Sequence, residues 1–388
     1  LDAAPEEIDA AGLHVFPGGI DSHVHFNEPG RTEWETIADG SAALAAGGYT
    51  SFVDMPLNNL PVTVDAAALE LKLRAARASS LVDFGFWGGL VPGRLDQLEN
   101  LAQRGVIGFK AFMCASGIDE FPACDAQTLR EGMLRIAELG SILLVHAEDP
   151  EVLEREARRV RGTGARDFIR SRPPEAELAA IRGAIDLASE TGCRLHIVHV
   201  STVAGVELIS DARRRGVDVT GETCPHYLLY VEEDLERLGG PGKCAPPFRT
   251  PGDREGLWRA LASGELAMVV SDHSPSTLDL KRGDDFFKLW GGISGCQSTR
   301  QLLLAEDRLS LPEVAAVTST HVAARFGLEG KGDIAPGFEA DLWLVDLTAE
   351  DEVRRDDLRY RNRFSAHEGQ RTRGKTVATI LRGRSIDP

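Results

Sequence analysis

The chain has 388 residues, of which 43% are hydrophobic and 27% charged, and its formal net charge is −17. This composition is typical of a globular protein with a sizeable core, and it excludes disordered and fibrous classes. The negative charge, with no long basic run to offset it, argues against nucleic acid and anionic membrane surfaces as partners.

The cysteines and the N-terminus indicate where the protein works. Six cysteines are spread along the chain without a Cys-x-x-Cys pair, which favours reduced thiols and a cytoplasmic location. No apolar stretch approaches the ~18 residues of a membrane span, and the first residues lack the features of a signal peptide. Since the sequence begins with Leu1 rather than Met, we expect it to start inside a longer gene product.

Short apolar runs alternate with longer stretches of helical period, which is the pattern of parallel strands joined by crossover helices. The expected strands are residues 18–25, 50–56, 82–90, 107–113, 142–148, 195–200, 218–223 and 267–272. The expected helices are residues 33–46, 66–78, 126–138, 175–190, 203–215, 254–262 and 294–304. Eight such units predict an α/β fold, a (β/α)8 TIM barrel. An open doubly wound sheet is the alternative, but no glycine-rich nucleotide-binding loop supports it.

After the barrel, the pattern changes to β structure. A Gly/Pro turn at 332–337 leads into an expected strand at 340–346, and residues 375–382 alternate as a second strand. These strands predict a small β subdomain formed from the chain ends. Its other strands would precede Ala11, so its N-terminal part is expected to be missing. We therefore divide the chain into a subdomain remnant (1–15), a catalytic metal-binding barrel (16–330) and a C-terminal β segment (331–388).

Polar residues stand at the ends of the expected strands, where barrel active sites are built. His23 and His25 are two residues apart, so both imidazoles point to the same side of the strand, into the barrel mouth. Taken alone, the pair is equally compatible with core histidines. Three further strand ends carry His146, His199 and Asp272, and these residue types are preferred ligands of zinc and similar ions. Together they predict a metal site.

Lys110 lies among apolar residues of the fourth expected strand. A bare ammonium in such a place is costly, and two neighbouring divalent cations would make it more so. Reaction with CO2 would turn the lysine into a carbamate, an anion whose two oxygens can bridge two metals. A buried lysine paired with a carboxylate and a Schiff-base lysine remain alternatives.

The order His-x-His, Lys, His, His, Asp resembles the cyclic amidohydrolases of the urease-related superfamily, a group that includes dihydroorotases, dihydropyrimidinases and allantoinases. The resemblance extends over nearly the whole chain and includes the segment 222–228 and the strand at 340–341. It implies two divalent ions, with the carbamylated lysine bridging both. The implied ligands are His23, His25 and Asp272 for one ion, His146 and His199 for the other, and Lys110 for both.

The same resemblance implies a mechanism and an assembly. A metal-activated bridging hydroxide attacks the amide carbonyl, while Asp272 takes its proton and hands it to the leaving ring nitrogen. Zinc is the expected metal, and cobalt, manganese and nickel stay open because the same ligands accept them. The family also implies a homo-oligomer, specifically a tetramer.

Residues around the ligands distinguish the branches of this group. Dihydroorotases follow the His-x-His pair with an Arg that holds the substrate carboxylate, whereas Phe26 and Asn27 follow it here, and Arg31 is the nearest cation. Dihydropyrimidinases and hydantoinases have a Tyr five residues after the bridging lysine, where this chain has Ala115. Segments resembling the allantoinase branch are 26–35, 55–59, 116–122, 271–275 and 290–295.

This branch implies that the hydantoin ring of allantoin is opened to give allantoate, with dihydropyrimidines, hydantoins and dihydroorotate as alternative substrates. The expected substrate contacts are Asn27, Asn58 and Ser274 with the backbone of Ala245 and Gly291. Each of these residues is equally suited to structuring a loop. His226 and His273 are expected to support the site rather than bind metal. A non-catalytic scaffold with the same barrel is the alternative outside enzymes, and the complete ligand set disfavours it.

Overall fold

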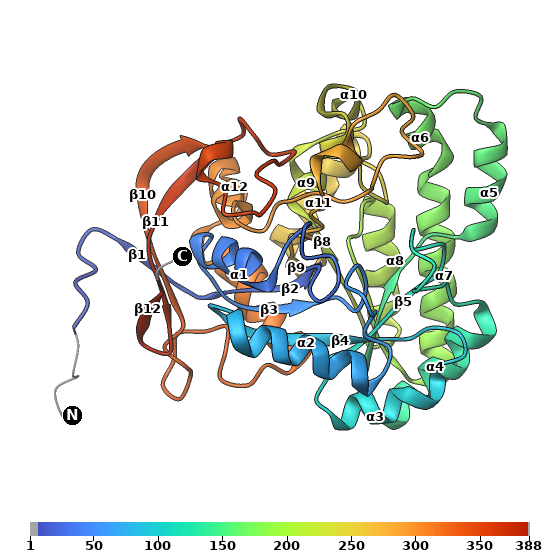
Figure 1. The fold of residues 1–388 in the computed structure, drawn as a ribbon, viewed down its shortest axis with the longest axis horizontal. Helices are drawn as coiled ribbons and strands as arrows, with labels where there is room; N and C mark the ends of the chain where they lie inside the picture. Colours follow the sequence, from blue (N-terminus) through green and yellow to red (C-terminus); the bar gives the residue numbers. More distant parts are fainter. Residues whose placement is uncertain (1–6, 387–388) are drawn as a thin grey trace.

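The computed structural model describes residues 7–386, in which eight parallel strands form a barrel beside a small antiparallel sheet (Figure 1). The barrel strands are β2 (Gly19–Val24), β3 (Tyr49–Asp54), β4 (Asp83–Gly89), β5 (Gly108–Phe112), β6 (Ile142–His146), β7 (Arg194–Ile197), β8 (Val219–Thr223) and β9 (Met268–Val269). Each strand pairs with the next one along the chain. The last strand returns to the first through a parallel bridge between Val24 and His273, where the His25 N–H donates to the His273 carbonyl at 2.7 Å. The predicted TIM barrel is confirmed.

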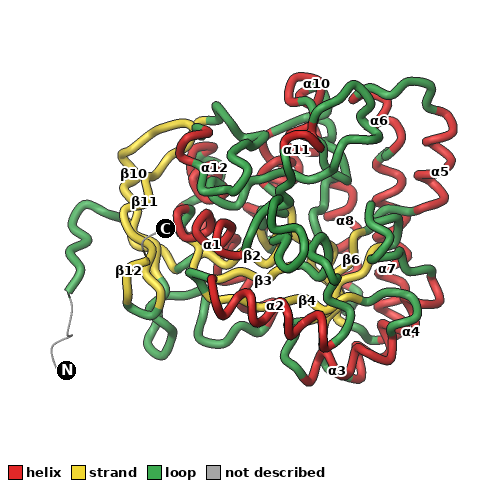
Figure 2. Tube along the Cα trace, viewed as in Figure 1, coloured by secondary structure: helices red, strands yellow, loops and turns green. Residues whose placement is uncertain are grey.

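Helices cover the outside of the strands (Figure 2). They are α1 (Ile37–Ala46), α2 (Ala66–Ser79), α3 (Leu98–Gln103), α4 (Ala126–Glu138), α5 (Pro150–Arg159), α6 (Ala165–Ser171), α7 (Pro174–Thr191), α8 (Val203–Arg214), α9 (Pro225–Leu229), α10 (Asp234–Leu238), α11 (Pro251–Ser263), α12 (Thr299–Glu306), α13 (Leu311–Ala315) and α14 (His321–Phe326). All seven expected helices are present; the one at 126–138 coincides with α4, and the other six differ from the expected bounds by up to five residues at one end. No helix among residues 7–386 is long and apolar enough to cross a membrane.

Local sequence explains where the helices begin and why the strands are apolar. Asp65, Asp125 and Thr202 cap α2, α4 and α8, and each side chain accepts a hydrogen bond from a backbone N–H in the first turn. Strands β2, β3, β5 and β6 are buried along their whole length, as expected of parallel strands covered on both faces. Polar residues in these strands therefore require a specific explanation.

The small sheet has the order β1-β10-β11-β12 and joins the two ends of the chain. Its strands are β1 (His14–Pro17), β10 (Leu342–Glu352), β11 (Arg371–Leu381) and β12 (Arg384–Ile386). The two expected C-terminal strands are confirmed, and the described part of the chain adds one partner strand, β1, after residue 11. The expectation that further strands precede residue 11 stays a prediction. Strand β1 is too short for its alternation to be separated from β2. The division at 15/16 and 330/331 stays a prediction, and residues 1–6 of the proposed remnant lie outside the described part.

Arg300 ties the small sheet to the amino ends of the barrel strands. Its buried guanidinium donates from Nη1 to the Gly48 carbonyl at 2.8 Å and from Nη2 to the Pro17 carbonyl at 3.1 Å. The guanidinium carbon also lies 4.2 Å from the ring centroid of Trp343 in β10. This end of the barrel is closed by packing, which leaves the carboxyl ends of the strands for a site.

Candidate metal centre and active site

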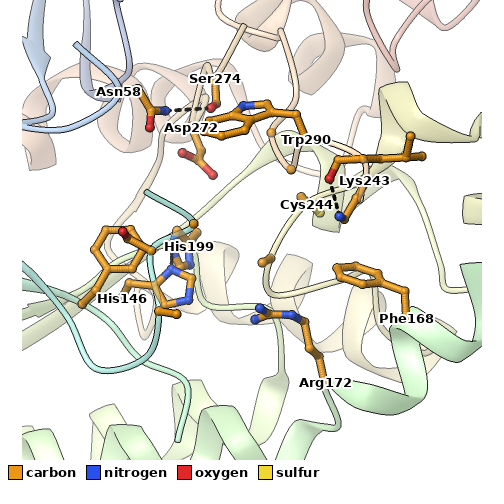
Figure 3. Close-up of a pocket in the computed structure, with 18 of the residues that line it drawn as sticks. Asn58, His146, Phe168, Arg172, His199, Lys243, Cys244, Asp272, Ser274 and Trp290 are labelled. Carbon is orange, nitrogen blue, oxygen red and sulfur yellow. Dashed lines mark hydrogen bonds between the residues drawn. The ribbon is translucent and has the colours of Figure 1, made fainter. Parts of the chain in front are cut away.

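A cavity of about 490 Å³ opens at the carboxyl ends of the barrel strands (Figure 3). Its volume suits a small ligand. Its floor holds the five residues predicted from strand ends, namely His23, His25, His146, His199 and Asp272. Lys110 does not line the cavity but is completely buried in β5. The structure therefore gathers side chains that are up to 249 positions apart into one cluster.

The first group of potential ligands comes from β2 and from the residues after β9. The Nε2 atoms of His23 and His25 lie 3.1 and 3.3 Å from the same carboxylate oxygen, Oδ1 of Asp272. Ligand atoms around a tetrahedral zinc with ~2.0 Å bonds are separated by about 3.3 Å. The donor atoms are thus spaced as they would be around one ion.

The second group lies beside the first, at the ends of β6 and β7. His146 Nδ1 and His199 Nε2 face each other at 3.0 Å, a separation that also fits two nitrogens on one ion. His199 and Asp272 have φ angles of 39° and 47°, in the left-handed region that non-glycine residues avoid. Such backbone strain costs about 1–3 kcal/mol and is typically retained at functional sites.

Lys110 Nζ is buried and has no hydrogen-bond partner among residues 7–386. It lies 4.9 Å from the ring centroid of Phe112. Burial lowers the pKa of Lys110 to about 7, so a large fraction of the side chain is a neutral, nucleophilic amine. Among residues 7–386 no acidic side chain lies within ion-pair distance of Lys110 Nζ. The alternative of a buried lysine paired with a carboxylate is therefore not supported.

Two buried carboxylates that sequence reasoning missed fix the rings of the histidines. Glu222 Oε1 lies 2.5 Å from His23 Nδ1, and Glu148 Oε2 lies 2.8 Å from His146 Nε2. Burial opposes ionisation, yet the charged neighbours lower the pKa of both carboxyl groups to about 2. Carboxylates in this position set the tautomer and orientation of ligand histidines. In the sequence, Glu148 could have been found by its place two residues after His146, just beyond the end of β6. Glu222 could have been found by its place near the end of β8.

Four of the five expected substrate contacts line the cavity: Asn58, Ala245, Ser274 and Gly291. Asn58 Nδ2 and Ser274 Oγ lie 3.5 Å apart at the upper edge in Figure 3. Asn27 does not line the cavity. Its amide is buried and donates to the backbone carbonyls of His25 and Pro275 at 3.3 and 3.4 Å. Its position therefore fits the loop-structuring alternative rather than a substrate contact.

The cavity also contains cations that the sequence did not reveal. Arg31, the nearest cation to the His-x-His pair, packs against the ring of Trp34 at 4.8 Å and does not line the cavity. Instead Arg172, Lys243 and Lys288 line it, and they come from loops far from the pair in sequence. The lack of a cation directly after the His-x-His pair therefore does not leave the cavity without cations. Arg172 is paired with Glu148.

Comparison with known proteins covers nearly the whole chain. The model of the amidohydrolase family matches residues 14–386. The allantoinase of Rubrobacter xylanophilus is 55% identical over 99% of this chain and 86% of its own length, and that of Escherichia coli is 41% identical over 99% and 87%. A solved structure, the L-hydantoinase (dihydropyrimidinase) from Arthrobacter aurescens, superimposes with a TM-score of 0.96 at 33% identity, covering 99% of this chain and 87% of that one. The chain belongs to the amidohydrolase family of metal-dependent enzymes, within its cyclic amidohydrolase group.

Proposed function

We propose that this enzyme hydrolyses the ring amide of allantoin to give allantoate. The observation that carries the proposal is the cluster of four histidines and Asp272 near Lys110, a buried lysine with no hydrogen-bond partner among residues 7–386. Relatives at 41–55% identity that are named allantoinases support the choice of substrate. They leave the scaffold alternative without support.

The donor atoms fit two divalent ions. His23, His25 and Asp272 would hold one ion, and His146 and His199 the other. Lys110, in β5, is close enough for its charge to act on His25 of the first group and on His146 and His199 of the second. As a carbamate it would supply the anion that both ions need. A carbamate also accounts for a buried amine that otherwise has no partner. Zinc suits these ligands, and cobalt, manganese or nickel would suit them too.

The chain's own residues hold the substrate and move one proton. Divalent ions bound here would activate water as a nucleophile and polarise the amide carbonyl. The carboxylate of Asp272 accepts the proton released by the attacking water and delivers it to the departing ring nitrogen. Glu222 and Glu148 keep His23 and His146 in a fixed orientation during this transfer. Asn58, Ser274 and the backbone of Ala245 and Gly291 line the cavity and are suited to hold the ring.

Hydrolysis of hydantoins or dihydropyrimidines is the second candidate, because solved structures with a similar fold are named for these activities. The cavity wall has Ala115 where those enzymes carry a tyrosine, which disfavours this candidate. Dihydroorotate is disfavoured for a different reason than sequence alone indicated. Its carboxylate would meet cations that already have partners: Arg172 pairs with Glu148, Lys288 pairs with Asp285, and Lys243 donates to the Leu289 carbonyl.

A substrate panel tests the proposal. Metal-loaded protein is assayed with allantoin, hydantoin, dihydrouracil and dihydroorotate, and kcat/KM is compared. Allantoin is expected to be the best substrate and dihydroorotate to be inert. Failure on both enantiomers of allantoin with two ions bound, or efficient turnover of dihydroorotate, would refute the assignment. A homotetramer in the cytoplasm stays a prediction, for which light scattering and cell fractionation are the tests.

A further inference from the structure

Allantoin differs from unsubstituted hydantoin by a ureido group on the ring, so an enzyme that prefers allantoin needs a polar partner for that group. The cavity wall includes several apolar side chains, among them Phe112, which stacks on His146, and Leu153, Ala157 and Phe168. Within this wall stands one guanidinium, that of Arg172. We propose that Arg172 determines specificity by donating hydrogen bonds to the ureido carbonyl oxygen. This inference rests on the proposed function.

Arg172 is positioned to reach a ligand. It follows the last residue of α6, and its guanidinium points into the cavity between His146 and Phe168 (Figure 3). The guanidinium carbon lies 5.7 Å from the ring centroid of Phe168, and Lys243 Nζ lies 4.9 Å from the same ring. The side chain keeps 22% of its surface exposed, toward the cavity that it lines.

The hydrogen bonds of Arg172 leave donors unused. Its Nη1 contacts the Glu148 carboxylate, and the Cys114 thiol is a second neighbour within hydrogen-bonding reach. Among residues 7–386 no other side chain or carbonyl accepts from this guanidinium, which has five N–H groups in all. Because Glu148 already balances its charge, the free N–H groups suit a neutral carbonyl better than a second carboxylate. A urea carbonyl meets that condition.

The backbone carbonyl of Arg172 is held in place by a chain of buried hydrogen bonds. Arg249 donates from Nη1 to the Arg172 carbonyl at 2.6 Å and from Nε to Ser201 Oγ at 2.9 Å. Ser201 in turn donates from its N–H and its hydroxyl to Glu177, at 2.7 and 2.9 Å. Such a preorganised group loses little conformational freedom when a ligand binds.

The experiment compares two substrates that differ only in the ureido group. We measure kcat/KM for allantoin and for hydantoin, together with metal content and thermal unfolding, in metal-loaded wild type, Arg172→Met and Arg172→Lys. Arg172→Met removes a charged hydrogen-bond donor to a neutral acceptor. The ratio of kcat/KM for allantoin to kcat/KM for hydantoin is therefore expected to fall about 10-fold or more. Arg172→Lys keeps a cation beside Glu148, so the same ratio is expected to fall by less than in Arg172→Met. Both variants are expected to keep two ions.

The matched control is Lys288→Met, which removes an exposed cation from the same cavity rim and should leave the ratio unchanged. A parallel fall for both substrates, with loss of an ion, would mean that Arg172 acts only through Glu148 and His146, and would overturn the inference. An unchanged ratio in a folded Arg172 variant would overturn it as well, while the wild type's activity on allantoin preserves the proposed function. A wild type that opens hydantoin but not allantoin would refute both.

Discussion

Lys72 and Lys110 are both completely buried, but only Lys72 has the partners that a buried ammonium requires. Lys72, on α2, lies 2.9 Å from an Asp54 carboxylate oxygen and donates to the Met55 carbonyl at 2.6 Å and to Asn59 Oδ1 at 3.0 Å. Lys110, on β5, has no hydrogen-bond partner in the described part of the chain. The first lysine is explained by its surroundings and the second is not.

This difference separates a structural cation from a functional one. A buried charge without a partner is unfavourable by several kcal/mol, so it persists only where chemistry changes the group or a ligand completes it. At Lys72, the Asp54 carboxylate balances the charge of the ammonium and two neutral oxygens accept its hydrogen bonds. Near Lys110 stand the nitrogens of histidines and the Asp272 carboxylate, which fit metal ions, and the proposed carbamate would turn the amine into an anion suited to such ions. Substitutions at the two lysines test this contrast, and substitutions at Glu222 and Asn27 apply the same test to other buried polar groups.

The largest effect is expected at Lys110. Lys110→Ala removes the anion proposed to bridge the two ions, so turnover of allantoin should fall by more than the ~100-fold that loss of an outer partner of a ligand costs. Metal content should fall too, while thermal stability of the apoprotein should hold or rise because a buried amine without a partner is removed. A short carboxylic acid in the buffer is expected to restore a small part of the activity. Full activity and two ions in the variant would rule out the bridge.

Lys72→Met should affect stability instead of chemistry. It leaves Asp54 buried and unpaired, and breaking such a pair typically costs about 3–5 kcal/mol in the free energy of unfolding. Denaturant unfolding measures this loss. The variant that remains folded should bind two ions, with kcat/KM for allantoin close to that of the wild type. A loss of metal with unchanged stability would reverse the assigned roles of the two lysines.

Glu222→Gln tests a partner rather than a ligand. The amide removes the charge beside His23 Nδ1 but keeps the shape, so metal affinity or turnover should fall about 10- to 100-fold. Equilibrium dialysis and steady-state kinetics give the two quantities. If neither changes, the carboxylate only fills space between His23 and His196.

The smallest effect is expected at Asn27. Its amide donates to two loop carbonyls and does not line the cavity, so Asn27→Ala should lower the free energy of unfolding by about 1–2 kcal/mol and leave KM for allantoin near its wild-type value. Asn58→Ala, at the cavity edge, is the comparison and should raise KM. A raised KM in Asn27→Ala alone would restore its role as a substrate contact.

Strand periodicity predicted the barrel. It also predicted that the five residues at the strand ends, His23, His25, His146, His199 and Asp272, lie together, because the carboxyl ends of parallel strands meet at one end of a barrel. The same spacing of two residues would have found Glu148, which follows His146 just beyond the end of β6. Arg172 and Lys243 could not be found in this way, since loops and short helices place them and no simple period relates loops to the barrel axis. β1 was missed because four residues give too little alternation to distinguish a separate strand.

We propose that Lys110 carries a CO2-derived carbamate at a two-metal site, and isotopic labelling can detect this carbamate. Protein is loaded with metal in the presence of ¹³C-bicarbonate, and the carbonyl region of its ¹³C NMR spectrum is recorded beside a metal analysis. A diamagnetic metal such as zinc keeps the signal visible. Wild type and Lys72→Met should each show one labelled carbamate per chain with two ions, and Lys110→Ala should show none. Two ions bound in wild type without any labelled carbonyl would contradict the account.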